Sequence, residues 1–194
     1  SDSIHSDFNL FLFSLKILNL LPVTGDVFTP EMFKYMRKYL EPDTEVQTYQ
    51  ITSGPPSIEC EYDEALAAPD VLRLAKQGEE DGFQAIFINC FGDPAVKAAR
   101  EYVDIPVFGG FEPATHIALG LADSISIVTV LPNVVPNVEG NVSKARLNGR
   151  IVSIRNVNIP VEELQDHEKL CKALAEQSLL AISEDGAQAI VMGC

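Results

Sequence analysis

Residues 80–90 read EDGFQAIFINC, and residues 184–194 read EDGAQAIVMGC. The two stretches are identical at seven of eleven positions, at a constant offset of 104 residues. Each reads as the end of a helix, a glycine at the C-terminal cap, a buried strand and then a cysteine. A period of this length is too long for a solenoid repeat. The repeat therefore indicates two copies of one α/β half.

The rest of the chain supports an α/β class. Apolar runs bounded by turn residues alternate with segments of helical periodicity. This alternation predicts two pseudo-symmetric lobes, each a mostly parallel sheet flanked by helices. We expect the first lobe to span residues 15–111 and to carry Cys90, and the second to span residues 112–194 and to carry Cys194. Leu15–Leu21 is expected to be the first buried strand rather than a signal-peptide core, because acidic residues precede it.

Composition narrows the classes of partner and cofactor. The formal charge of −14 at pH 7 argues against nucleic acid and anionic membranes. The four cysteines and three histidines show no zinc-site spacing, and neither a GxGxxG nor a GxxxxGKS/T motif occurs. Scattered cysteines in a chain of this size favour reduced thiols. We therefore expect a cytoplasmic homo-oligomer that acts on a small molecule without a metal or other cofactor.

The residues around Cys90 suit an acid–base thiol. Ligands of open α/β sheets bind beyond the carboxyl ends of the strands, where Cys90 is expected. Gly92 allows close approach of the backbone to a ligand. Asp93 is expected to cap the following helix, and Pro94 suits the first turn of that helix. A helix N-terminus beside a thiol favours the thiolate.

The second cysteine, Cys194, follows the equivalent strand and is expected to face Cys90. Two opposed thiols indicate a two-base reaction. One thiolate removes a proton from a carbon next to a carbonyl, and the other thiol returns a proton to the opposite face. Backbone N–H groups after the strands are expected to stabilise the negative oxygen.

Other ionisable residues receive structural interpretations. Cys171 falls in a helical pattern and is predicted to be core, and Cys60 is predicted to be a structural residue in a loop that could approach the site. Asp70 is expected to cap a helix that runs to Glu80. An acidic cluster is interpreted as solvated surface rather than a catalytic site: Glu59, Glu61, Asp63 and Glu64.

Several motifs, in order and at consistent spacing, resemble the hydantoin racemase branch of the aspartate/glutamate racemase superfamily. They are Gly54–Glu59 (GPPSIE), Tyr62–Ala65 (YDEA), Asn89–Pro94 (NCFGDP), Ala98–Glu101 (AARE), Glu184–Gly186 (EDG) and Gly193-Cys194.

The resemblance implies two α/β lobes with the site in the cleft between them. It also implies racemisation of 5-substituted hydantoins or allantoin, or more distantly of aspartate or glutamate. Cys90 and Cys194 would be the two acid–base thiols. The residues that the resemblance places on the substrate surface are Ser57, Gly92, Asp93, Thr129 and Gly193.

The chain departs from the family pattern at two loops. Leu21–Gly25 stands where relatives have Asn-Pro-Asn-Thr-Ser, and Thr129-Val130 with Asn133-Val134 stands where they have Thr-Thr and Arg-Thr. These changes remove hydrogen-bonding groups, so the substrate stays open. Relatives also continue beyond the position of Cys194, and the second lobe is therefore expected to be truncated at its C-terminus.

The function predicted from the sequence is that of a cofactor-independent racemase or epimerase of a hydantoin-like or amino-acid-derived small molecule. One alternative keeps the fold but changes the chemistry to a decarboxylase or a cis–trans isomerase of small diacids, with one catalytic cysteine. Another is a catalytically silent protein that binds a small molecule in the same cleft.

Overall fold

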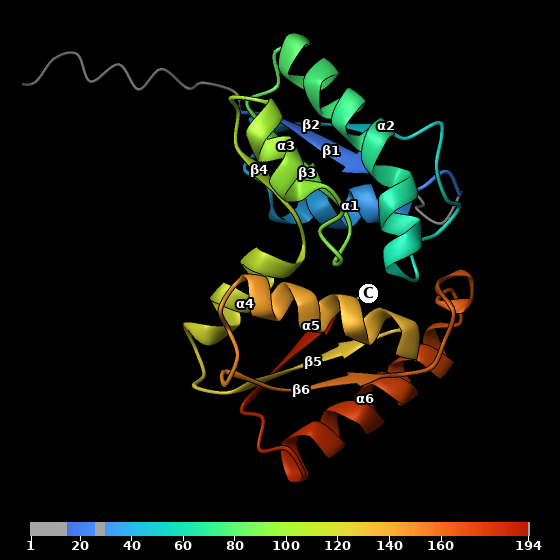
Figure 1. Ribbon diagram of the computed structural model, residues 1–194, viewed down its shortest axis with the longest axis vertical. Coiled ribbons are helices and arrows are strands. Elements are labelled where there is room, and N and C mark those ends of the chain that lie inside the picture. Colours follow the sequence, from blue (N-terminus) through green and yellow to red (C-terminus); the bar gives the residue numbers. More distant parts are fainter. Residues whose placement is uncertain (1–14, 26–29, 194) are drawn as a thin grey trace, which may run out of the picture.

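The computed structural model describes residues 15–25 and 30–193. It contains two parallel sheets, each flanked by helices, which form the upper and lower halves of Figure 1. The predicted α/β class with two lobes is thereby confirmed. The boundary between residues 111 and 112 stays a prediction.

The first sheet and its helices comprise β1 (Lys16–Leu21), α1 (Pro30–Tyr39), β2 (Glu45–Gln50), α2 (Glu61–Glu80), β3 (Ala85–Ile88), α3 (Val96–Tyr102) and β4 (Val107–Phe108). The second sheet and its helices comprise α4 (Phe111–Leu119), β5 (Ile125–Thr129), the 3-10 turn η1 (Pro132–Val134), α5 (Val135–Lys144), β6 (Ile151–Asn156), the 3-10 turn η2 (Val161–Glu163), α6 (His167–Ser183) and β7 (Ala189–Gly193). None of the described helices is long and apolar enough to cross a bilayer.

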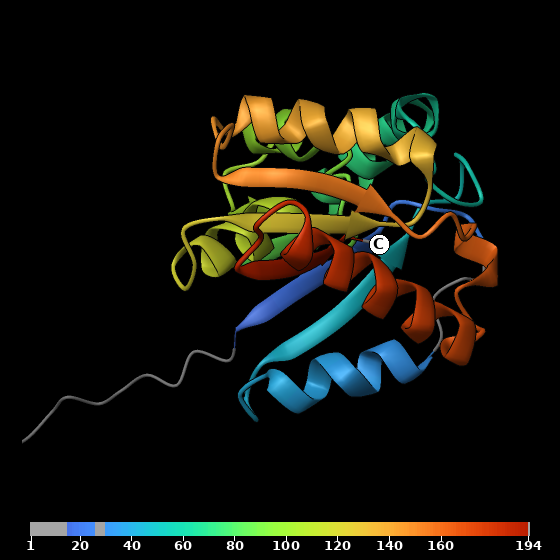
Figure 2. The ribbon, with the colours of Figure 1, turned by 90° about the horizontal axis from the view of Figure 1, so that it is seen from below.

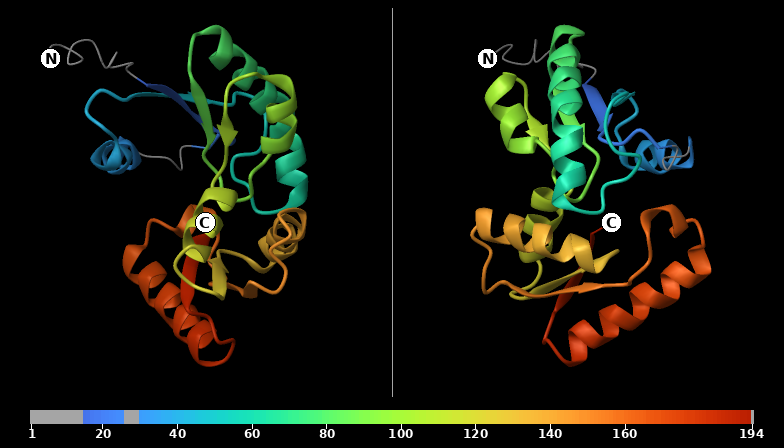
Figure 3. Two further views of the ribbon diagram at one scale, coloured as in Figure 1. Left: turned by 90° about the vertical axis from the view of Figure 1, so that its left-hand side faces the viewer. Right: turned by 45° about the vertical axis from the view of Figure 1, so that its right-hand side comes forward.

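The two sheets repeat one topology. Their strand orders are β2-β1-β3-β4 and β6-β5-β7, and every pairing is parallel. Helix α1 lies on one face of the first sheet, with α2 and α3 on the other (Figure 3). In the second sheet α5 and α6 lie on opposite faces (Figure 2). The strands of the repeated stretch, β3 and β7, thus occupy equivalent places beside β1 and β5.

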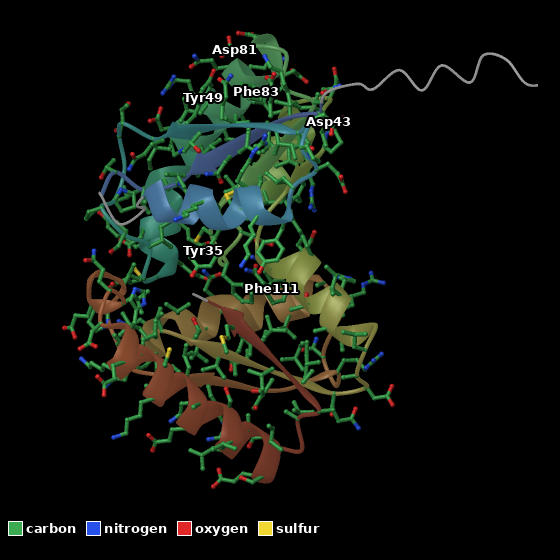
Figure 4. The ribbon with its side chains drawn as sticks, turned by 180° about the vertical axis from the view of Figure 1, so that it is seen from behind. Tyr35, Asp43, Tyr49, Asp81, Phe83 and Phe111 are labelled. Carbon is green, nitrogen blue, oxygen red and sulfur yellow. The ribbon has the colours of Figure 1, made fainter. Side chains whose placement is uncertain are left out.

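The repeated glycines end the helices that precede these strands. Gly82 after α2 has φ +83°, and Gly186 after α6 has φ +73°. Both lie in the left-handed region that glycine adopts without steric cost, as predicted for the caps. The first turn is also fixed by Tyr49, which donates a 2.6 Å hydrogen bond to Asp81 and packs edge-on against Phe83 at 5.6 Å between ring centroids (Figure 4).

The repeated glutamines explain another part of the identity. The side-chain oxygen of Gln84 accepts the N–H of Lys16 at 2.8 Å, and that of Gln188 accepts the N–H of Asp123 at 2.9 Å. Each glutamine thereby attaches the start of its strand to the chain entering the neighbouring strand. The register of each central pair is fixed at the end of the sheet opposite the predicted site.

Each sheet has its own apolar core. In the first, Leu18 and Ile86 are fully buried under α2, and in the second Ile125 and Ile127 are fully buried. Phe91 follows β3 in the chain but belongs to the second core. It packs edge-on against Phe111, the first residue of α4, at 5.6 Å between centroids. Figure 4 shows Phe111 where the two lobes meet, so Phe91 joins the lobes through buried apolar area.

Two local predictions were wrong. Helix α2 begins at Glu61 rather than at Asp70, and Pro69 is accommodated in its interior. The tertiary contacts of this helix outweigh the proline, since Ala67 and Val71 on either side are fully buried. Cys171 is exposed, because it lies on the solvent side of α6 and not in the core.

Asp70 anchors the loop that leads towards the predicted site. Its Oδ2 accepts the N–H groups of Thr52 at 2.7 Å and Ser53 at 3.2 Å, and its Oδ1 accepts Nε of Arg73 at 2.6 Å. Burial alone would raise the pKa of Asp70, but the hydrogen bonds from Arg73 and the two backbone N–H groups lower it to about 2. The ionised carboxylate is therefore part of the folded structure.

We expect Asp70→Asn to destabilise the fold by about 2 kcal/mol at pH 7, the value of the pKa depression. Because the folded pKa lies below the unfolded one, the wild-type contribution is complete above about pH 5 and is lost as the pH falls towards 2. Urea unfolding from pH 7 to pH 3 measures this, and the difference between wild type and variant should shrink on acidification. Equal stability at pH 7 would contradict the assignment.

Candidate active site

The carboxyl ends of β3, β5 and β7 meet at one small cavity between the lobes. The cavity has a volume of about 40 Å³. Thr129 closes β5, Gly193 closes β7, and Cys90 lies two residues beyond the end of β3. All three line the cavity, together with residues of α2 and α5. Parallel strands with the same polarity in both lobes bring these ends together, as the general rule for open α/β sheets requires.

Four of the predicted site residues line this cavity: Cys90, Gly92, Thr129 and Gly193. Cys194 lies outside the described residues, directly after Gly193 in the chain. Ser57 is not among the lining residues, although Ile58 follows it and is. The loop that carries Ser57 is pinned further back, where Pro55 accepts the N–H of Thr24 at 2.9 Å.

Asp93 has a different role from the predicted one. It was expected to cap the helix that follows it, but α3 is preceded by Ala95, whose side chain makes no capping hydrogen bond. The Asp93 carboxylate instead caps α4, accepting the N–H of Phe111 at 2.9 Å and of Glu112 at 3.4 Å. Burial raises the pKa of Asp93, and the N–H groups at the start of α4 oppose that shift. Asp93 therefore fixes the Cys90 loop to the second lobe.

Thr129 combines burial with an unused hydroxyl. It is 1 % exposed, and its Oγ1 has no protein hydrogen-bond partner among the described residues. A buried unpaired hydroxyl costs about 1–3 kcal/mol, so such a group in a cavity wall calls for an explanation.

Glu64 is a site residue that sequence reasoning missed. It was interpreted as solvated surface, but it lines the cavity and accepts a short hydrogen bond from Nδ2 of Asn137. Burial raises its pKa to about 7, against the effects of the Asn137 hydrogen bond and of Lys144. Its place in the first turn of α2 would have been the available signal, had α2 been predicted to start at Glu61.

Cys60 also lines the cavity, so its structural interpretation was incomplete. Its Sγ donates to Oδ2 of Asp63 at 3.2 Å, and the same oxygen accepts the N–H of Glu59 at 3.0 Å. Asp63 thus holds the N-terminus of α2 in place. The described residues contain no cluster of three or more His, Cys, Asp or Glu side chains that could bind a metal ion.

Three hydrogen bonds hold the lobes together around the cavity. Besides the Asn137–Glu64 pair, Nδ2 of Asn141 donates to the carbonyl of Gly92 at 2.8 Å. On the other side of the cavity, the N–H of Val161 donates to Oε1 of Glu59 at 3.1 Å. These contacts close the lobes over the carboxyl ends of the strands.

Two of the residues that depart from the family pattern form an apolar wall. Val130 and Val134, which the sequence analysis identified as departures, both line the cavity. In the other departing loop, Val23 is buried, and its carbonyl accepts Nε2 of Gln50 at 3.0 Å. One departure therefore changes the surface of the site, and the other is taken up by packing.

Comparisons with known proteins agree with this geometry. The family model described as Asp/Glu/Hydantoin racemase matches residues 17–194. A hydantoin racemase from a Pseudomonas species is 35% identical over 181 residues, which are 93% of this chain and 72% of the relative. The protein is therefore an isomerase of the racemase class, as predicted from the sequence.

Two solved structures are similar throughout. An allantoin racemase from Klebsiella pneumoniae superposes with a TM-score of 0.87 at 34% identity, covering 93% of this chain and 74% of that one. An allantoin racemase from Pseudomonas fluorescens gives 0.86 at 28% identity, covering 93% and 77%. The predicted resemblance to hydantoin racemases is confirmed.

We expect Gly193→Ala to destabilise the protein by about 1–3 kcal/mol, the usual cost of overpacking. An added Cβ would lie 2.5 Å from Cε1 of the Phe91 ring. Gly140→Ala is the matched control, because a Cβ added there would meet nothing within 4 Å beyond its own turn of helix. That helical change should stabilise by about 0.5–1 kcal/mol. Urea unfolding measures both, and adding Phe91→Leu should offset part of the Gly193→Ala cost. A silent Gly193→Ala would show that the ring does not press on β7.

Proposed function

Because the chain belongs to the Asp/Glu/hydantoin racemase family, we propose that it racemises a hydantoin-like ring without a cofactor, using the thiols of Cys90 and Cys194. The observation that carries the proposal is the duplicated strand followed by cysteine. One copy ends with Cys90 in the cavity wall, and the other reaches the same wall at Gly193. The proposal includes a homo-oligomeric state and a cytoplasmic location, as expected from the sequence.

The proposed reaction inverts the carbon between the ring nitrogen and the adjacent carbonyl. One cysteine, as the thiolate, takes the proton from this carbon, and the pair of electrons moves onto the carbonyl oxygen. The other cysteine, as the thiol, returns a proton to the opposite face. The unpaired hydroxyl of Thr129 is suited to donate to the oxygen that becomes negative.

The charges in the cavity wall support a neutral ring over a dicarboxylate. The described residues that line the cavity include no lysine, arginine or histidine, but they do include Glu59 and Glu64. A substrate with two carboxylates would enter such a wall without a compensating side-chain charge. This favours a hydantoin or allantoin over aspartate, glutamate or a small diacid.

The size of the cavity requires the lobes to separate when substrate enters. Ligand pockets commonly measure about 300–1,000 Å³. The cavity here measures about 40 Å³, far below that range, so a substrate needs more room than the described arrangement offers. Opening breaks the hydrogen bonds that Asn137, Asn141 and Val161 donate across the cleft. Closure then excludes water from the reacting carbon.

We expect the wild-type protein to replace the ring C–H hydrogen of an enantiopure 5-substituted hydantoin, or of allantoin, with deuterium in D2O. Proton NMR and optical rotation follow exchange and inversion. Cys90→Ser and Cys194→Ser should each lower the rate of inversion by about 10²–10⁴-fold. Cys171→Ser is the matched control, because that thiol is exposed on α6, and its rate should equal the wild type's.

Absence of exchange with every member of a panel of hydantoins, allantoin, aspartate and glutamate would overturn the proposal. Loss of carbon dioxide from a substituted malonate, or isomerisation of maleate, with Cys194→Ser still active, would support the single-thiol alternative. Tight binding of a hydantoin without any exchange would support the catalytically silent alternative.

Thr129→Val should separate function from stability. Removing the unpaired hydroxyl should leave the free energy of unfolding unchanged or raise it, and should lower kcat/KM about 10- to 100-fold. Ser126→Ala is the matched control on the same strand, because the Ser126 hydroxyl is paired with Ser153 Oγ at 2.7 Å. It should lose stability and keep its activity. Urea unfolding and initial rates measure both, and full activity of Thr129→Val would exclude its hydroxyl from the site.

A further inference from the structure

A second cavity lies beside the first, and Glu64 lines both. The second cavity has a volume of about 260 Å³, and its wall includes Asp93, Lys97, Glu112 and Lys144. Among the described residues, only Glu64 and Gly92 occur in the walls of both cavities. The Glu64 side chain therefore lies at the boundary between the small cavity, which Cys90 lines, and the larger, polar cavity.

The position of this carboxyl group is fixed from two sides. Asn137 donates its side-chain N–H to Oε1 of Glu64 from α5, across the cleft. The same oxygen lies against the α-carbon of Gly92, so closely that a Cβ there would clash with it. Asn137 is 4 % exposed and lines the small cavity as well. Packing and hydrogen bonding thus hold Glu64 at the boundary between the two cavities.

We propose that Glu64 is the proton-transfer residue that returns the Cys90 thiol to its starting protonation state between turnovers. This rests on the proposed two-thiol racemisation. Each inversion leaves the two thiols with their protonation states exchanged. A second molecule of the same enantiomer reacts only after Cys90 and its partner thiol have exchanged protons with solvent.

The transfer balances without any other reactant. The Glu64 carboxylate accepts the proton that leaves Cys90, directly or through one water, and then releases it to water in the larger cavity. The partner thiolate regains a proton from water. For the opposite enantiomer the same steps run in reverse. A space of about 10–15 Å³ suffices for one water, and the small cavity exceeds that volume.

The charges around Glu64 suit this role at neutral pH. Burial is the largest of the causes that raise its pKa to about 7, and the nearby Glu61 on its own helix and Asp93 on the Cys90 loop contribute to that rise. Asn137 and Lys144 on α5 act in the opposite direction. A carboxyl group with a pKa near the working pH gives and takes protons with little driving force lost in either direction.

The test compares E64Q with the wild type on an enantiopure hydantoin or allantoin at pH 7. Gln keeps an oxygen that Asn137 can donate to, but it cannot carry a proton. We expect kcat at saturating substrate to fall about 100-fold. At low substrate the free enzyme has time to exchange protons with bulk water, so kcat/KM should stay within about twofold. Imidazole, a small carrier with a pKa near 7, should restore kcat in proportion to its concentration.

Two further variants complete the experiment. E80Q is the control, because Glu80 is exposed at the opposite end of α2 and outside both cavities; it should match the wild type. E64D keeps a carboxyl group that is shorter by one methylene, and it should give an intermediate kcat that imidazole raises. It carries the test if E64Q does not fold.

An unchanged kcat in E64Q would overturn the relay and leave the racemase proposal intact. Equal losses in kcat and kcat/KM, without rescue by imidazole, would also overturn it, since they would show a purely structural contact between the lobes. No inversion by the wild-type protein would instead refute the proposed function, and the relay with it.

Discussion

The arrangement of the site depends on one aromatic ring. Phe91 directly follows Cys90, yet it packs in the core of the second lobe against Phe111 and against the backbone of Gly193. The neighbours of the two cysteines in the chain are thus in contact. Buried apolar area fixes the distance between the two strand ends, because a close-packed core does not deform continuously. The Asp93 cap on α4 then aligns the loop that the ring anchors.

The sequence predicted those features that come from local pattern and from repetition. The duplicated stretch predicted β3, β7, the left-handed Gly82 and Gly186, and two equivalent strand ends. It could not predict that Asp93 caps α4, because the N–H groups it binds are brought to it only by the packing of the lobes. The start of α2 was missed for a similar reason. A proline usually ends or kinks a helix. At Pro69 the buried contacts of the residues on either side outweigh the hydrogen bond that the proline removes.

The interpretation of Glu64 as solvated surface was wrong because the sequence does not show which distant segment packs against it. Four acids within six residues are typical of a solvated surface. Two of them hold the backbone: Asp63 accepts the N–H of Glu59, and Glu59, which also lines the small cavity, accepts the N–H of Val161. Glu64 is partly buried against α5, which belongs to the other lobe. Burial by a segment more than seventy residues away leaves no local pattern. The apolar wall of Val130 and Val134, in contrast, was visible as a departure from the family motif, and the structure places both in the cavity.

Two-thiol chemistry makes two opposing demands on the cleft. The reacting carbon must be kept from water, since exclusion of water strengthens the electrostatic interactions that stabilise a carbanion-like intermediate and prevents side reactions. The thiols, however, must exchange protons with water once in every turnover. The cavity measures about 40 Å³. Full separation of the lobes for this exchange would break the hydrogen bonds that Asn137, Asn141 and Val161 donate between them. A titrating carboxyl group at the boundary between the two cavities transfers the proton from the thiol to water without admitting water to the reacting carbon. Glu64 occupies that position, which makes the contact between the lobes part of the chemistry as well as of the closure.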